Sequence, residues 1–168
     1  YEDDILVSST RIRQVITEGD MEIAKQLLGR HYQMRGVVQV GKQRGGSEIG
    51  FPTANLKLNP KDLVPRHGVY VSQVISDGKC YGGVLNIGKN PTFGEDELLA
   101  ETHIFDFDRD IYGKSIKINL LKYLRGEEKF SGISELAEQI GRDVVEARRI
   151  LAENQLELAL TCGEKFNS

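Results

Sequence analysis

The order of hydrophobic and polar positions predicts two short helices within residues 8–28. Apolar residues recur there at helical spacing on both sides of a Gly19-Asp20 break. Asp20 can cap the second helix, MEIAKQLL, and Gly29 ends it.

Five later runs are short and rich in Val, Ile, Tyr and Phe, which is the pattern of β-strands. Asp77-Gly78, between two of these runs, predicts a hairpin turn. Because no helical stretch of about ten or more residues separates the runs, parallel pairing is disfavoured and a small antiparallel barrel is predicted. The runs cover residues 32–41, 68–78, 80–88, 101–108 and 114–124.

The last part of the chain returns to a helical period. One apolar stripe runs through residues 133–160, which predicts a helix packed on the barrel, capped by Ser131 or Ser134. The stripe consists of Ile133, Leu136, Ala137, Ile140, Val144, Ala147, Ile150 and Leu151.

Composition then narrows the class of protein. The chain has 168 residues, 39% apolar and 28% charged, which is ordinary for a globular domain. A net charge of −3 disfavours a nucleic-acid-binding barrel, which would need a basic face. No apolar run is long enough to span a membrane, so a cytoplasmic location is expected. Cys80 and Cys162 have no metal-ligand spacing and are expected to be free thiols.

The densest candidate chemistry lies in residues 41–55, GKQRGGSEIGFPTAN. Its glycines let backbone N–H groups turn toward an anion, although a flexible hairpin has the same composition. Thr53 and Asn55 would point to one face of an extended chain and offer two neutral oxygens. Such a pair suits a magnesium ion that arrives with a nucleotide, while a simple turn is the competing interpretation.

Three further stretches are less specific when they are read alone. NIGKNPTF, residues 86–93, has the composition of a tight turn. In ETHIFDF, Glu101 could accept a proton from a substrate hydroxyl or be a surface acid, and His103 is expected to be structural. In LRGEEKF, Arg125 could bind an anion or a planar ring, or belong to a solvated turn.

Taken together, these stretches resemble the riboflavin kinase family. The resemblance runs from Gly41 to Phe130 and rests on G-x-x-R-G, G-F-P-T-A-N, N-I-G-x-x-P-T-F, E-T-H-I, Y-G and L-R-x-E-x-x-F, in that order. It implies a mainly β fold: a six-stranded antiparallel, Greek-key-like β-barrel with a C-terminal helix packed on it. It also implies Mg²⁺-dependent transfer of the ATP γ-phosphate to the ribityl 5′-hydroxyl of riboflavin, giving FMN and ADP.

The resemblance implies a role for each matched residue. Glu101 matches the catalytic acid–base residue, and Thr53 and Asn55 match the ligands of the metal. Some members have lysine where Ser47 stands here, so Arg44 or Lys42 is expected to supply positive charge near the phosphates. The ATP-binding positions are Gly41, Ser47, Thr53, Asn55, Ile104, Asp106 and Tyr112, and the flavin-binding positions are Arg125, Glu128 and Phe130.

The N-terminal stretch SSTRIR, residues 8–13, resembles the end of the nucleotidyltransferase half of bacterial bifunctional enzymes that make FMN and then FAD. Residues 1–30 are therefore interpreted as a remnant and linker of that half, and residues 31–168 as the kinase domain. The expected partner is the missing FMN adenylyltransferase domain. Because the His-x-Gly-His signature of that domain is absent from the sequence, FAD synthesis is not expected.

Two alternatives to a riboflavin kinase stay open. A non-catalytic flavin- or nucleotide-binding module would keep the pocket without needing Thr53, Asn55 and Glu101 together. A kinase acting on a different alcohol would share the fold, because function resides in the site.

Overall fold

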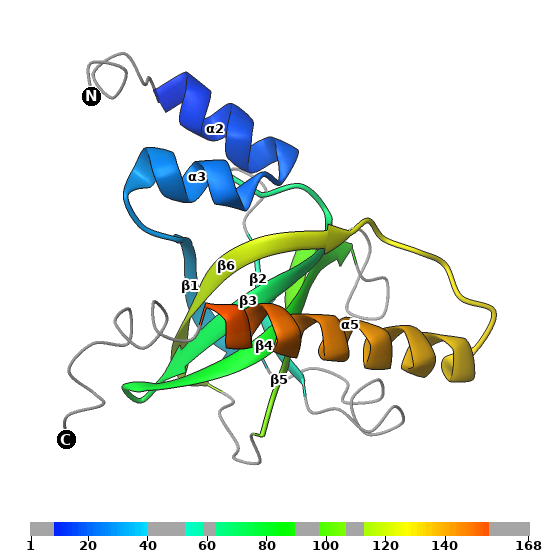
Figure 1. The fold of residues 1–168 in the computed structure, drawn as a ribbon. Coiled ribbons are helices and arrows are strands. Elements are labelled where there is room, and N and C mark those ends of the chain that lie inside the picture. The colour runs from blue at the N-terminus through cyan, green and yellow to red at the C-terminus, as the bar shows by residue number, and fades with distance from the viewer. Residues whose placement is uncertain (1–8, 40–52, 59–62, 90–97, 107–112, 155–168) are drawn as a thin grey trace.

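The computed structural model describes residues 9–39, 53–58, 63–89, 98–106 and 113–154 (Figure 1). Six strands and three helices lie within these ranges. The helices are α2 (Ser9–Glu18), α3 (Met21–Leu28) and α5 (Ile133–Glu153), and the strands are β1 (Tyr32–Gln39), β2 (Thr53–Lys57), β3 (Gly68–Ser76), β4 (Lys79–Lys89), β5 (Leu98–Ile104) and β6 (Ser115–Arg125).

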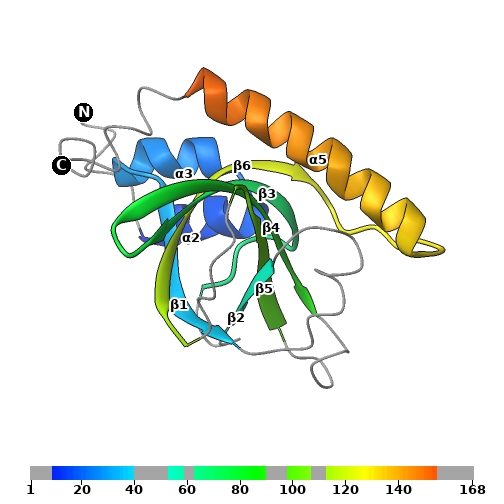
Figure 2. The same ribbon diagram turned by 90° about the horizontal axis from the view of Figure 1, so that it is seen from below.

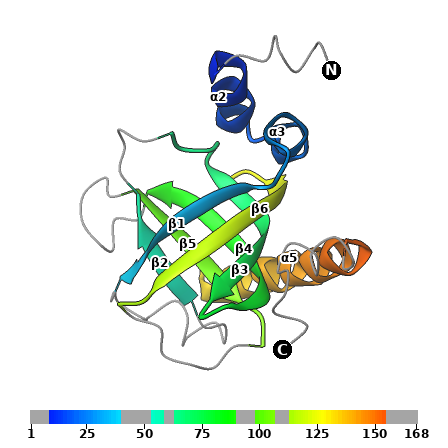
Figure 3. The same ribbon diagram turned by 90° about the vertical axis from the view of Figure 1, so that its left-hand side faces the viewer.

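The strands form a closed antiparallel barrel in the order β1-β2-β5-β4-β3-β6, and β6 pairs with β1 to close it (Figure 3). Strands β3, β4 and β5 follow one another as neighbours, and β6 returns to lie beside β3. This arrangement is a Greek key. The predicted six-stranded Greek-key barrel with a C-terminal helix is therefore confirmed.

The barrel interior is filled by apolar side chains that alternate with outward-facing residues along each strand. Buried members include Leu56 of β2, Leu85 and Ile87 of β4, and Ile118 and Leu120 of β6, all with exposed fractions of 1% or less. A packed interior of this kind leaves ligands to bind on the outside of the barrel wall.

Helix α5 supplies the cover for part of that wall. It lies along the outside of the barrel, on the side away from β1 and β2 (Figure 2). Its apolar face makes a second hydrophobic cluster with the strands. The members of this cluster are Val69 and Val71 of β3, Val84 of β4, Phe105, Leu121 of β6, and Ala147 and Ile150 of α5.

The predicted stripe and cap of α5 need two corrections. Ile133 is 50% exposed because it lies at the first turn, ahead of the part of the helix that packs on the strands. The N-cap is Gly132, without a side-chain cap. Neither serine caps the helix; the backbone N–H of Ser131 donates instead to Glu135 Oε1 at 3.0 Å.

Helices α2 and α3 pack on one end of the barrel and share its main hydrophobic cluster through Val15, Ile16, Met21 and Ala24 (Figure 1). The predicted turn between them is confirmed. Asp20 Oδ1 accepts a hydrogen bond from Ile23 N at 3.2 Å, and Gly29 ends α3 in the left-handed conformation. Among the described residues, no helix is long and apolar enough to cross a membrane.

The Asp77-Gly78 hairpin is confirmed, and both residues have the positive φ that a type I′ turn requires. Strand β2 was not among the five runs, because its TANLK sequence is too short and polar to show a strand pattern.

Cys80 is disulfide-bonded, so the prediction that it is a free thiol is wrong. The other cysteine, Cys162, lies outside the described residues.

Replacing Gly68 tests how closely the end of β6 approaches the start of β3. Its φ is +146°, and an added Cβ would lie 2.5 Å from the carbonyl oxygen of Arg125. Gly68→Ala should lower the free energy of unfolding by about 2–4 kcal/mol, from backbone strain plus displacement of that carbonyl. Urea denaturation measures the change.

Gly141 is the matched control, because it lies within α5 with no atom within 4 Å of an added Cβ. Gly141→Ala should raise the free energy of unfolding by about 0.5–1 kcal/mol through helix propensity. A Gly68→Ala protein as stable as the wild type would contradict the close approach.

Candidate active site

The pairing of β5 with both neighbours sets three polar side chains side by side. Glu101 is the register partner of Asn55 in β2 and of Asn86 in β4. Directly paired residues of antiparallel strands point to the same face, with Cβ atoms about 4.5–5.5 Å apart. Because the neighbours Ala54, Ala100 and Leu85 face the barrel core, this polar row lies on the outer face.

Glu101 is a partly buried acid in the middle of the row. Burial raises its pKa above the ordinary value for a glutamate. An acid with a raised pKa beside a cavity is typical of a proton acceptor or donor in catalysis. The geometry thus favours the catalytic interpretation of Glu101 over that of a surface acid.

Asn55 provides the test of whether a metal fits here. Its side chain is 4% exposed, and its Oδ1 has no hydrogen-bond partner among the described residues. A buried carbonyl oxygen without a partner carries a desolvation cost that a ligand can remove. Thr53 lies two residues earlier on the same face of β2. Two neutral oxygens on one face fit a magnesium ion whose remaining ligands come from phosphate and water.

His103 lies next along the same face of β5, paired with Thr53 and with Val84. Burial lowers its pKa to about 4, against an opposing effect of Asp143. The imidazole is therefore neutral at pH 7 and a weak base. This agrees with a structural role for His103.

A cavity of about 720 Å³ opens beside the polar row, between the barrel wall and α5. Its size is within the range of small-molecule sites. Apolar and charged side chains share its wall. The lining consists of Val69, Val84, Asn86, Glu101, His103, Arg125, Glu127, Glu128, Phe130, Gly132, Ile133, Leu136, Ile140 and Asp143.

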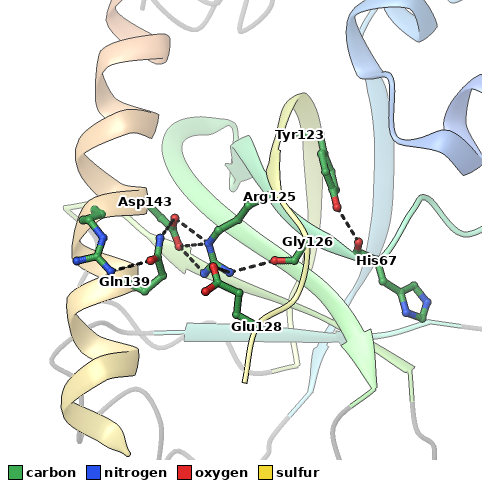
Figure 4. A network of polar contacts seen from close by, with 8 residues as sticks. His67, Tyr123, Arg125, Gly126, Glu128, Gln139 and Asp143 are labelled. Carbon is green, nitrogen blue, oxygen red and sulfur yellow. Dashed lines mark hydrogen bonds and ion pairs between the residues drawn. The ribbon is translucent and has the colours of Figure 1, made fainter. Parts of the chain in front are cut away.

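Arg125, at the end of β6, is fixed in this wall by an ion pair with Asp143 of α5 (Figure 4). Arg125 Nη2 and Nε donate to the two carboxylate oxygens at 2.8 and 3.1 Å, which is the bidentate geometry of a strong pair. Asp143 is 5% exposed and also accepts from Gln139 Nε2 at 3.0 Å. The outer nitrogen Nη1 of Arg125 donates to Glu128 Oε1 at 3.3 Å.

The structure brings some predicted site residues together and separates others. Glu101, Arg125, Glu128 and Phe130 line one cavity, and Thr53 and Asn55 lie on the adjoining strand. Of the remaining predicted positions, Ile104 and Asp106 are not among the residues that line this cavity.

Ile104 and Asp106 lie beyond the polar row. The Ile104 side chain is 4% exposed and belongs to the barrel core. Asp106 is exposed and pairs with Arg148 of α5 at 3.3 Å. The predicted ATP-binding positions Gly41, Ser47 and Tyr112 lie outside the described residues.

Two residues of the site were missed in the sequence. Asp143 interrupts the apolar stripe of α5 three residues after Ile140, and an acid on a buried helix face signals a buried partner. Asn86 lies in the run 80–88, which was predicted to be a strand and forms part of β4, but no role was assigned to its side chain. Its register with Glu101 exists only in the folded barrel.

A partly buried acid that faces a cavity of this size places the protein among enzymes that act on small molecules. Comparison with known proteins narrows this class. The family profile "Flavokinase: Riboflavin kinase" matches residues 28–151. The chain belongs to the riboflavin kinase family.

Individual relatives agree with this assignment. The chain is 46% identical to the bifunctional riboflavin kinase/FMN adenylyltransferase of Bacillus subtilis, covering 88% of this chain and 48% of that protein. The protein of the same name from Listeria monocytogenes is 42% identical, with 87% and 46% covered. The chain thus spans about half the length of these curated relatives.

Two solved structures share the fold. One, named a macrolide-efflux protein from Streptococcus pneumoniae, superposes with a TM-score of 0.76 at 40% identity, covering 84% of this chain and 46% of that one. The other, a riboflavin kinase from Trypanosoma brucei, has a TM-score of 0.54 at 26% identity, covering 81% of this chain and 88% of that one.

The pair of Arg125 and Asp143 can be tested by replacing the acid. Asp143→Asn should lower the free energy of unfolding by about 1–3 kcal/mol, since the partly buried guanidinium loses its charged partner. Glu146→Gln is the control in the same helix, because Glu146 pairs with Arg149 at the surface. That change should cost about 0.5 kcal/mol or less. Equal losses in the two variants, measured by urea denaturation, would contradict a structural role for the buried pair.

Proposed function

We propose that this chain transfers the γ-phosphoryl group of MgATP to the 5′-hydroxyl of riboflavin, giving FMN and ADP. The observation that supports the assignment of roles is the position of Glu101. It lies between the unsatisfied Asn55 oxygen on β2 and the cavity that contains Arg125 and Phe130. Phosphoryl donor and alcohol acceptor thus have separate places on either side of one acid.

The donor side is formed by β2. Thr53 and Asn55 would hold the metal that accompanies ATP, in keeping with the buried, unpartnered Oδ1 of Asn55. A magnesium ion at this place supplies neutralisation of the phosphate charge, on which phosphoryl transfer largely depends. Thr53 and Asn55, as neutral ligands on a paired strand, fix its position without adding negative charge near the phosphates.

The acceptor side is the cavity under α5. Phe130 and Ile133 offer apolar surface for a flavin ring, and Arg125 and Glu128 offer polar groups at its edge. The bidentate pair with Asp143 holds the Arg125 side chain in one orientation before any ligand binds. Such preorganisation reduces the entropy lost on binding.

Glu101 acts in its deprotonated form. Its carboxylate orients the 5′-hydroxyl toward the phosphoryl group and takes the hydroxyl proton as the new O–P bond forms and the bond from phosphorus to the ADP oxygen breaks. His103, neutral beside it, adds no competing charge.

The relatives' names add FMN adenylyltransferase to the kinase activity. We propose that α2 and part of α3, which precede the segment matched by the family profile, belong to the connection with such a domain. FMN released by the barrel would then be the substrate of that second domain. FAD formation is not proposed for the present chain.

The direct test is incubation of the purified chain with riboflavin, ATP and Mg²⁺, followed by chromatography. FMN and ADP should appear in equal amounts, and EDTA should abolish both. Binding of riboflavin without formation of FMN would favour a non-catalytic flavin-binding module, and faster phosphorylation of a different alcohol would reassign the acceptor.

Glu101→Gln should lower turnover about 10²- to 10⁴-fold while leaving ATP affinity unchanged, since the amide cannot accept the proton. Steady-state kinetics with riboflavin measures the first effect, and calorimetric titration with MgATP the second. Turnover within a few-fold of the wild type would remove Glu101 from the catalytic role.

The raised pKa of Glu101 gives this role a pH signature. The proton acceptor must be ionised, so kcat should fall as the pH drops through the raised pKa, at a higher pH than for an ordinary glutamate.

The free energy of unfolding should depend on pH in the opposite direction. Because the folded state favours the protonated acid, the stabilising contribution of Glu101 is present at low pH and lost as the pH rises through that pKa. Glu101→Gln should therefore be more stable than the wild type at pH 8, measured by thermal denaturation.

Asn55→Ala should raise the Mg²⁺ concentration needed for half-maximal activity about tenfold, the effect of losing roughly 1.4 kcal/mol from one ligand. Lys57→Ala is the control, because Lys57 lies two residues further along β2 and is exposed. A Mg²⁺ titration of the initial rate distinguishes the two. An unchanged Mg²⁺ requirement in Asn55→Ala would contradict the metal assignment.

A further inference from the structure

Asn86 of β4 has no part in the function described above, although it lies beside the proposed acid. It is the register partner of Glu101, on the side opposite Asn55. Its Oδ1 is buried and has no hydrogen-bond partner among the described residues. A buried amide oxygen without a partner lowers the stability of the folded protein, so a ligand that hydrogen-bonds it would remove that cost.

In a second row of amide side chains in the same barrel, the amides hydrogen-bond to one another. Gln33 of β1, Asn119 of β6 and Gln73 of β3 are register partners across three strands, as Asn55, Glu101 and Asn86 are. There, Gln33 Nε2 donates to Asn119 Oδ1 and Asn119 Nδ2 donates to Gln73 Oε1, both at 2.9 Å. The strand geometry therefore permits a hydrogen-bonded row, and the row at Glu101 is left open for a ligand.

The position of Asn86 indicates which ligand it meets. Asn86 lines the cavity together with Glu101, Arg125 and Phe130, whereas Asn55 is not among the lining residues. The two amides thus lie on opposite sides of the acid: Asn55 toward the proposed phosphate side, and Asn86 toward the acceptor side.

We infer that Asn86 binds the hydroxyl groups of the acceptor's polyol chain, next to the hydroxyl that Glu101 deprotonates. This inference rests on the function proposed above. A side-chain amide suits a polyol because it has both a donor and an acceptor, and each hydroxyl can serve as either. The terminal torsion of asparagine is broad, so the amide can present either atom to the cavity.

The consequence is selectivity for the chain of the flavin and not for its ring. A site that hydrogen-bonds a hydroxyl discriminates against an analogue without it, because the polar group of the protein is then left without a partner. Asn86 also holds the polyol near its reacting end, so that the 5′-hydroxyl stays within reach of Glu101.

The test compares two ligands that share the ring. Riboflavin carries the polyol chain, and lumiflavin has a methyl group in its place. In Asn86→Ala, the Kd for riboflavin should rise about three- to tenfold, the effect of losing one hydrogen bond, while the Kd for lumiflavin changes less than about twofold. Flavin fluorescence measures both affinities. In kinetics, KM for riboflavin should rise with KM for ATP unchanged.

Asn119→Ala is the matched control, because it removes a buried asparagine that is hydrogen-bonded within the fold. It should lower the midpoint of thermal unfolding and leave the ratio of the riboflavin and lumiflavin affinities unchanged. Should Asn86→Ala fail to fold, Asn86→Val supplies a strand-favouring side chain that cannot form a hydrogen bond, and the same ratio of affinities is measured.

The outcomes separate this inference from the proposed function. An unchanged riboflavin affinity in the Asn86 variant, or equal losses for riboflavin and lumiflavin, would overturn the inference even where the wild type makes FMN. A wild type that binds riboflavin without making FMN would overturn the kinase proposal, and the affinity ratio would still support or overturn the role of Asn86.

Discussion

Everything at the site depends on how β5 is paired between β2 and β4. The two registers place Asn55, Glu101 and Asn86 in one row on the outer face. Side chains alternate between the faces of a strand, so a slip of one residue would turn Glu101 into the packed interior. The apolar residues on the inner face of β5, Leu98, Ala100 and Ile104, prevent that slip because they fill the core. The hydrophobic interior thus determines where the acid stands.

Because the interior is filled, the cavity lies on the outside of the barrel, where α5 forms its second wall. Two unlike interactions hold that helix. Its C-terminal half packs through Ala147 and Ile150 on the strands, which buries apolar surface. At the middle of the helix, Asp143 pairs with Arg125 at the end of β6. A buried ion pair adds little net stability but is directional, so it defines the geometry of the cavity wall.

Local patterns in the sequence predicted much of the fold but a smaller part of the candidate site. Helices α2 and α3, five strands and the Asp77-Gly78 turn follow from periodicity and turn chemistry, which act over a few residues. The sixth strand came only from the family resemblance, because β2 is five residues long and its polar residues hide the strand pattern. Glu101 and Arg125 were candidates because of the motifs that contain them. Asn86 stood in a motif without an assigned role and Asp143 stood in none, because each meets its partner, distant in sequence, only after folding.

Closure of the barrel has a consequence for how such a unit is inherited. Each of the six strands has a neighbour on both sides, because β1 pairs with β6. A sheet without an open edge offers no template for pairing with a foreign strand. Gene fusion or separation can therefore add or remove a neighbouring domain without leaving an unpaired strand edge that another chain could pair with. The share that the chain covers differs between relatives: 88% of the solved Trypanosoma brucei riboflavin kinase chain and 48% of the bifunctional Bacillus subtilis protein.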